Sequence, residues 1–211
     1  MQKNKYELKN FEYLFGTPGF SDKLLTNHFK LYEGYVKNTN ELSEMLASGK
    51  DLEEAKSPHF AELRRRFGWE FNGMRLHEYY FGNMGRKTTP LAYGSALSMR
   101  IADEFVSFER WQKEFTSLGA MRGIGWVMLA ADNMADRLFN IWINEHDSGL
   151  LAGVTPLLVM DVFEHAYITD YGLEKEKYVV SFWNAIQWPE VENRFEAWLS
   201  CQPMAESGKR K

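Results

Sequence analysis

The stretch PLLVMDVFEHA, from Pro156 to Ala166, constrains the fold more than any other part of this 211-residue chain. It opens with an apolar run typical of a buried strand and then continues into Asp161, Glu164 and His165, which lie among apolar and aromatic neighbours. Burying ionisable groups costs free energy unless each one has a partner. These three side chains therefore indicate a partnered site at the end of a buried strand.

Composition narrows the class of protein. With 45% hydrophobic and 26% charged residues, the chain resembles an ordinary soluble globular protein. The formal net charge of −4 gives no general attraction to nucleic acid. The N-terminus lacks the apolar core of a signal peptide, and no apolar run approaches the roughly 20 residues that span a bilayer. We therefore expect a cytoplasmic protein with neither a nucleic-acid nor a membrane partner.

The single cysteine, Cys201, excludes an intrachain disulfide and any metal site built from several cysteines. A metal in this chain would need histidine, aspartate or glutamate ligands.

Apolar periodicity divides the chain into two parts. Residues 20–49 read as a helix with Ser21 as its N-cap and Gly49 at its end, and a second helix is expected from about His59 to Met84. The segment GNMGRKTTP then breaks the pattern with two glycines and a proline. We expect a helical N-terminal domain over residues 1–88.

The remainder, residues 89–211, mixes helices and strands. One or two helices are expected in residues 92–115, and helical spacing returns over 175–199. Between them lie the runs GWVMLAAD, RLFNIWIN and PLLVMDV, of which the first two can form a hairpin and the third can complete a three-stranded antiparallel sheet. The predicted fold class is α+β, with residues 89–211 as a C-terminal domain in which helices flank the sheet.

Histidines are the candidate ligands. His59 and His146 lie in polar, turn-like segments and are interpreted as exposed loop residues. His28 and His77 lie on apolar helix faces, and His165 follows the strand that ends at Asp161. Taken singly, each of these three fits a hydrogen-bonded core residue. Taken together, three imidazoles and one carboxylate suit a divalent or trivalent metal.

Several segments resemble the iron/manganese superoxide dismutase family in order and spacing. They are NGMRLHEYYFGNM, GIGWVMLAADNMADRLFNIWINEHDSG, PLLVMDVFEHAYITDYG and YVVSFWNAIQW, preceded by the first helix. The resemblance implies one iron or manganese ion per subunit, with two ligands from the N-terminal domain, His28 and His77, and two from the C-terminal domain, Asp161 and His165. It implies an enzyme, an oxidoreductase that disproportionates superoxide.

The resemblance also implies which residues surround the metal. Tyr35, Tyr32 and Arg122 are the candidate catalytic residues. The candidate neighbours of the ligands are Glu164, Trp126, Phe163 and Tyr167. By the family's pattern Glu164 reaches a ligand histidine across a two-fold interface, which predicts a homodimer and possibly a tetramer.

The first helix departs from the family. The family usually spaces its ligand histidine and active-site tyrosine eight residues apart, whereas His28 and Tyr35 are seven apart, and a literal alignment places Asn27 at the ligand position. At about 100° per residue, a seven-residue step returns to the same helix face and an eight-residue step overshoots it. We therefore favour His28.

Further departures lie near the expected site. Tyr32 stands where the family commonly has a gateway histidine, and Ile168 replaces the tyrosine that usually pairs with it. The family has a glutamine beside the metal, in either of two positions of the sequence. In this chain those two positions hold Gly73 and Arg122, so neither supplies a glutamine. Glycine has no side chain, and arginine is a donor with fixed charge. The redox potential of the bound metal therefore does not follow from the family's usual pattern.

Two alternative functions follow. A redox or oxygen- or peroxide-reactive metalloprotein on the same scaffold is favoured if Arg122 points at the metal. A non-catalytic metal-binding or assembly protein is favoured if the chain keeps its fold without metal.

Overall fold

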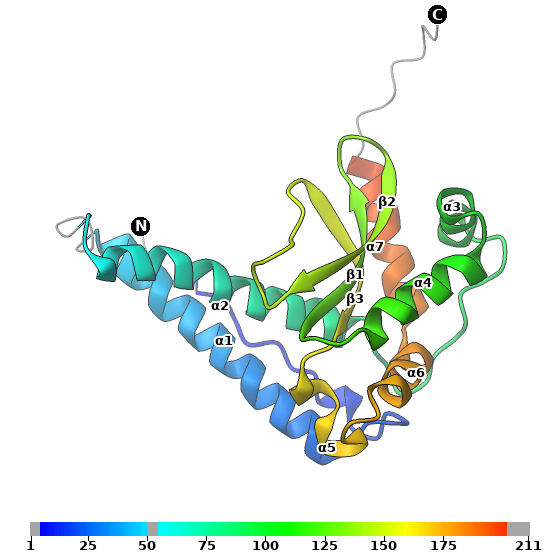
Figure 1. The fold of residues 1–211 in the computed structure, drawn as a ribbon, viewed down its shortest axis with the longest axis horizontal. Coiled ribbons are helices and arrows are strands. Elements are labelled where there is room, and N and C mark those ends of the chain that lie inside the picture. Colours follow the sequence, from blue (N-terminus) through cyan, green and yellow to red (C-terminus); the bar gives the residue numbers. More distant parts are fainter. Residues whose placement is uncertain (1–4, 50–54, 202–211) are drawn as a thin grey trace, which may run out of the picture.

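The computed structural model describes residues 5–49 and 55–201. Its N-terminal part is a hairpin of two long helices, α1 (Asp22–Ser48) and α2 (Pro58–Gly82), which extends to one side of the molecule (Figure 1). The hydroxyl oxygen of Ser21 accepts the amide of Leu24 at 3.1 Å, and Gly49 ends α1 in the left-handed conformation with φ 68°. Both predicted ends of the first helix are confirmed. His59 is exposed as expected, but it lies in the first turn of α2 and not in a loop.

Helices of the C-terminal part pack against a sheet. The region predicted to hold one or two helices holds two, α3 (Ala96–Phe105) and α4 (Phe108–Ala120). The predicted closing helices are α6 (Lys175–Ala185) and α7 (Trp188–Cys201). In Figure 1 these four helices lie on the opposite side of the sheet from the extended end of the α1–α2 hairpin.

The three predicted strands form one antiparallel sheet. They are β1 (Gly125–Asp132), β2 (Arg137–Asn144) and β3 (Val154–Asp161), in the order β2-β1-β3. The predicted hairpin and third strand are confirmed, and so is the α+β fold class. The domain boundary at residue 88 stays a prediction.

The register of β1 against β3 positions the site. Trp126 pairs with Asp161, so the beginning of the central strand, β1, lies beside the last residue of β3. The register shifts between Leu129 and Ala130, where the partners are Leu158 and Pro156. The shift is a bulge, which accommodates a proline that cannot donate to the ladder.

Short helices that the sequence analysis did not anticipate follow β3. They are the 3₁₀ turn η3 (Glu164–Ala166) and α5 (Ile168–Tyr171), and another 3₁₀ turn, η1 (Glu12–Leu14), precedes α1. Segments of three or four residues are too short to show helical periodicity. Across the described ranges, no helix is both long enough and apolar enough to cross a membrane.

Candidate metal centre

Four side chains that the sequence places far apart meet between the helical hairpin and the sheet. His28 comes from α1, His77 from α2, Asp161 from the end of β3 and His165 from η3. Each offers one ligand atom, and these atoms all lie within 4.8 Å of one another. The structure thus brings together the whole predicted ligand set.

The three imidazoles face the same carboxylate oxygen. Oδ2 of Asp161 lies 3.1 Å from Nε2 of His28, 3.1 Å from Nε2 of His165 and 3.6 Å from Nε2 of His77. His28, His77 and Asp161 are buried, whereas the His165 side chain keeps 28% of its surface exposed. Asn27, the alternative ligand on α1, is exposed and outside this cluster.

The hydrogen bond of His77 shows why this arrangement suits a cation. Nδ1 of His77 donates to the carbonyl oxygen of Gly73 at 2.6 Å, so Nε2 of the neutral ring carries a lone pair. Nε2 has no hydrogen-bond partner among the described residues, and it faces a carboxylate that also carries lone pairs. An orphaned buried acceptor opposite an anion is costly unless a cation lies between them. The residues therefore fit a divalent or trivalent metal.

The ionisation states suit metal binding as well. Burial, followed by the proximity of His28, lowers the pKa of His77 well below its usual value, and burial likewise lowers the pKa of His28. Although burial opposes ionisation of Asp161, the facing His165 and His28 hold the pKa of this carboxyl far below its usual range. Neutral imidazoles and an ionised carboxylate are the ligand forms that metals require.

Two hydrogen bonds hold Asp161 in place, one to its carboxylate and one to its backbone carbonyl. Oδ1 of Asp161 accepts the amide of Phe163 at 2.9 Å, and the Tyr178 hydroxyl donates to the Asp161 carbonyl at 2.6 Å. Phe163 in turn stacks on the His165 ring, with centroids 5.2 Å apart. Two of the predicted neighbours, Trp126 and Tyr167, are buried as well.

His146 requires a correction, because it is not an exposed loop residue. It is fully buried, and its Nε2 lies 2.7 Å from the hydroxyl oxygen of Tyr35. The indole of Trp126 donates to Nδ1 of His146 at 3.1 Å. An indole N–H is a donor only, so Nδ1 is the acceptor and the neutral ring carries its proton on Nε2. His146 then donates to Tyr35, and the Tyr35 proton is free to point elsewhere.

The sequence context concealed this role. His146 follows β2 in the polar segment NEHDSG, which has the composition of an exposed turn. The segment folds back through paired backbone hydrogen bonds between Asn144 and Ser148, and the edge of Trp69 on α2 covers the imidazole with ring centroids 4.7 Å apart. The signal that could have found His146 was a lone imidazole two residues after the end of β2, whose neighbour β1 places Trp126 opposite the ligand Asp161.

Arg122 lies in an exposed turn between α4 and β1, so the expectation that it stands beside the metal is corrected. Gly73 has no room for a side chain, because a Cβ there would lie 2.6 Å from the Tyr35 ring. The polar side chain that contacts Tyr35 is His146.

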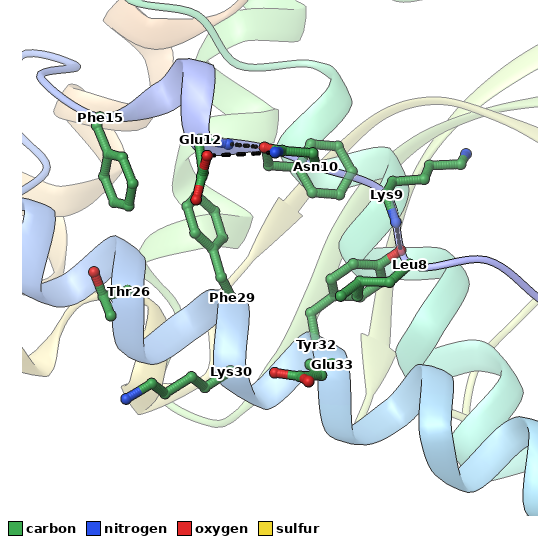
Figure 2. Close-up of a pocket in the computed structure, with 11 residues that line it drawn as sticks. Leu8, Lys9, Asn10, Glu12, Phe15, Thr26, Phe29, Lys30, Tyr32 and Glu33 are labelled. Carbon is green, nitrogen blue, oxygen red and sulfur yellow. Dashed lines mark hydrogen bonds between the residues drawn. The ribbon is translucent and has the colours of Figure 1, made fainter.

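Tyr32 also differs from its expected role. Its hydroxyl donates to Glu78 at 3.1 Å and accepts the amide of Lys9 at 3.2 Å, so it faces the N-terminal segment. Figure 2 shows Tyr32 and Lys9 at one end of a groove of about 430 Å³ between that segment and α1. The described residues that line the groove include none of the four clustered ligands. Tyr35 is therefore the tyrosine that faces the site.

Fold and cluster together define a mononuclear metalloprotein with three histidine ligands and one aspartate, built between a helical hairpin and a small α/β part. The profile of the family described as iron/manganese superoxide dismutases, C-terminal domain, matches residues 93–194. The chain belongs to the iron/manganese superoxide dismutase family.

Relatives of known activity support this membership over nearly the whole chain. An iron superoxide dismutase from Cupriavidus metallidurans is 38% identical over 184 residues, covering 85% of this chain and 90% of the relative. A manganese superoxide dismutase from Haloferax volcanii is 34% identical, covering 90% and 96%. An iron superoxide dismutase from Methanothermobacter thermautotrophicus is 33% identical, covering 93% and 97%. Relatives named for either metal thus match to similar extents.

Proposed function

We propose that this protein is a superoxide dismutase, an oxidoreductase that converts two superoxide anions and two protons into dioxygen and hydrogen peroxide. The ion, iron or manganese, would be held by His28, His77, Asp161 and His165. The observation that carries the proposal is the orphaned Nε2 of His77, which faces the Asp161 carboxylate within a closed cluster of ligand atoms.

When bound, the ion supplies one-electron chemistry, because it alternates between a divalent and a trivalent state. The residues supply the charge balance. Three neutral imidazoles and a single carboxylate leave a trivalent site with net positive charge, which favours an anionic substrate. The buried aromatic rings of Phe81 and Trp126, 5.9 and 4.9 Å from the His77 ring, exclude water and strengthen that attraction.

Tyr35 is the proposed proton donor. Burial raises the pKa of its hydroxyl, which therefore stays protonated at neutral pH. Because Nε2–H of His146 donates to the Tyr35 oxygen, the tyrosine proton is available to a reduced oxygen species beside the ligands. Trp126 supports this direction of donation by fixing the tautomer of His146.

A homodimer is part of the proposal, with a tetramer as a larger assembly of the same chain. Glu164 is exposed and adjoins His165, the one ligand that is partly open to solvent. The family's pattern, in which this glutamate contacts a ligand histidine of a second copy, suits that exposure. We also propose that the protein acts in the cytoplasm.

The alternative of another redox activity on the same scaffold depended on Arg122. Since Arg122 is exposed, the feature that would favour this alternative is missing from the described site. The non-catalytic alternative is disfavoured because the buried, mutually facing ligands have no structural use without a cation.

The test combines elemental analysis with an assay of superoxide consumption. We expect iron or manganese at one ion per chain, with metal and activity lost in His28→Ala and kept in the neighbouring Asn27→Ala. Bound metal without superoxide consumption would contradict the proposed activity and leave the metal site standing. Loss of metal in Asn27→Ala alone would contradict the ligand assignment.

A further inference from the structure

The four ligands belong to two parts of the chain. His28 and His77 lie on the α1–α2 hairpin, whereas Asp161 and His165 lie on β3 and η3. The distance between the two pairs is therefore set by whatever fixes the hairpin against the sheet. Several side-chain hydrogen bonds join these parts, among them Tyr35 to His146 and Tyr178 to Tyr80. Two further groups of bonds are distinct, because each involves the cap residue of a ligand-bearing helix and a segment that carries or closely follows a ligand.

The first group involves Asn83, which caps the end of α2 six residues after His77. Its Oδ1 accepts the amide of Val159 at 2.9 Å, and its Nδ2 donates to the carbonyl of Val159 at 3.1 Å. Val159 lies two residues before Asp161 in β3. One side-chain amide thus bonds both backbone groups of a strand residue, as a neighbouring strand would.

Further hydrogen bonds hold the side-chain amide of Asn83 in one orientation. Nδ2 also donates to the carbonyl of Tyr80 at 2.9 Å, and Nη1 of Arg194 on α7 donates to Oδ1 at 3.3 Å. The Asn83 side chain is fully buried, so water does not replace these partners without opening the core.

The second group involves Asp170 in α5, five residues after His165. Its Oδ2 accepts the amide of Ser21 at 2.7 Å, and its Oδ1 accepts the Ser21 hydroxyl at 2.6 Å. Ser21 is the N-cap of α1, the helix that carries His28. The carboxylate also lies at the positive end of that helix, where negative charge is favourable.

We propose that Asn83 and Asp170 are positioning residues of the metal centre. Asn83 holds His77 against Asp161, and Asp170 holds His28 against His165, so that together they set the spacing of the two ligand pairs. This inference rests on the metal site of the proposed function and concerns how tightly the ion is held, which is measurable without superoxide.

The chain offers a matched control for Asn83. Asn40 on α1 makes the same pair of bonds to one backbone residue, since Tyr6 donates its amide to Oδ1 at 2.8 Å and accepts from Nδ2 at 2.9 Å. Both partners lie in the N-terminal part, so this pair does not join the two halves of the ligand set.

Asp22 is the matched control for Asp170. Its Oδ1 accepts the amide of Gly16 at 3.0 Å at the same end of α1, again within the N-terminal part. Asp22 and Asp170 are both exposed, so replacing either one disturbs no core packing.

The experiment measures the rate at which a chelator removes iron or manganese from the full chain, together with the absorption spectrum of the bound metal. Each variant is examined at a temperature at which circular dichroism shows it to be folded. We expect Asn83→Ser to lose metal ten- to hundredfold faster than the wild type, about the effect of removing a group that orients a ligand, with a shifted spectrum. Asn40→Ser keeps the wild-type spectrum and rate.

Asp170→Ala and Asp22→Ala form the second pair and decide the outcome if Asn83→Ser does not fold. Faster metal loss in Asp170→Ala than in Asp22→Ala supports the proposal. Equal rates and equal spectra within the pair overturn it. A wild-type chain that takes up neither metal overturns the proposed function together with this inference, and that result is obtained before any variant is made.

Discussion

Nε2 of His146 lies 2.7 Å from the hydroxyl oxygen of Tyr35, although the two residues are 111 positions apart in the chain. Because Trp126 donates to the other ring nitrogen, the bond has a direction: it runs from His146 to Tyr35. The tyrosine is thereby left as a donor on the side of the ligands. Several measurable consequences depend on this direction.

Removing the imidazole should disable proton donation without removing the metal. We expect His146→Ala to lower superoxide consumption roughly ten- to hundredfold, because Tyr35 loses the group that orients it. His146→Gln, whose amide can both accept from Trp126 and donate to Tyr35, should keep most of the activity. Turnover at saturating superoxide, normalised to metal content, is the measurement. Equal activity in the alanine variant and the wild type would refute the role of His146.

Trp126→Phe should allow the neutral His146 ring to adopt either tautomer. With the indole donor gone, Nδ1 can carry the proton, Nε2 becomes an acceptor, and Tyr35 then donates to His146 in place of the substrate. We expect a several-fold loss of activity at unchanged metal content. Trp111→Phe is the control, since Trp111 is equally buried and its indole donates to Asn140 at 2.9 Å, outside the ligand cluster. A similar loss in both variants would point to packing and not to the tautomer.

Gly73→Ala should displace Tyr35. A methyl group at this position would lie 2.6 Å from the Tyr35 ring, so the ring must move away from the site. We expect destabilisation by about 1–3 kcal/mol from overpacking, with reduced activity. Gly68→Ala in the same helix has open space around the new methyl group and should instead stabilise the protein by roughly 0.5–1 kcal/mol. Urea unfolding of the two variants provides the comparison.

The burial of His146 also predicts a pH dependence. Burial lowers the pKa of His146 to about 4, whereas the unfolded chain titrates near 6.5. The unfolded state therefore binds the proton first, so stability is full above about pH 6.5 and falls as the pH drops from there to 4. Between pH 7 and pH 4.5 the wild type should lose about 2 to 3 kcal/mol more than His146→Gln in the same metal state. Parallel unfolding curves for the two proteins across this range would contradict the assignment.

The long elements of the fold were predictable because their signals are local. The N-cap Ser21 and the glycine at the end of α1 bound an apolar stripe, and turn-forming residues bound the strands. The full ligand set came from the resemblance to the family, because the pattern alone left each histidine open to a role in the core. The pattern did indicate a partnered site, since an Asp and a His four positions apart at a strand end break an apolar run.

The position of His146 was not predictable in the same way. A polar turn composition describes how a loop starts and ends, but it does not reveal whether a neighbouring helix covers the loop. Here Trp69 covers it, from an element 77 residues earlier in the chain. The expectation for Arg122 came from aligning it with the family's glutamine, and its exposed position between α4 and β1 does not support that alignment.

The bulge between the pairs Leu129–Leu158 and Ala130–Pro156 divides the β1–β3 ladder into two stretches of different register. Trp126 and Asp161 lie on one side of it, and the β1–β2 turn lies beyond the other. Asp132 and Arg137 are the last pair of the continuous β1–β2 ladder before that turn, so an insertion between them leaves the pairing of both ladders in place. The distal end of the sheet is thus free to diversify in length, and it is a natural place to graft a tag or an additional loop while the ligand end keeps its geometry.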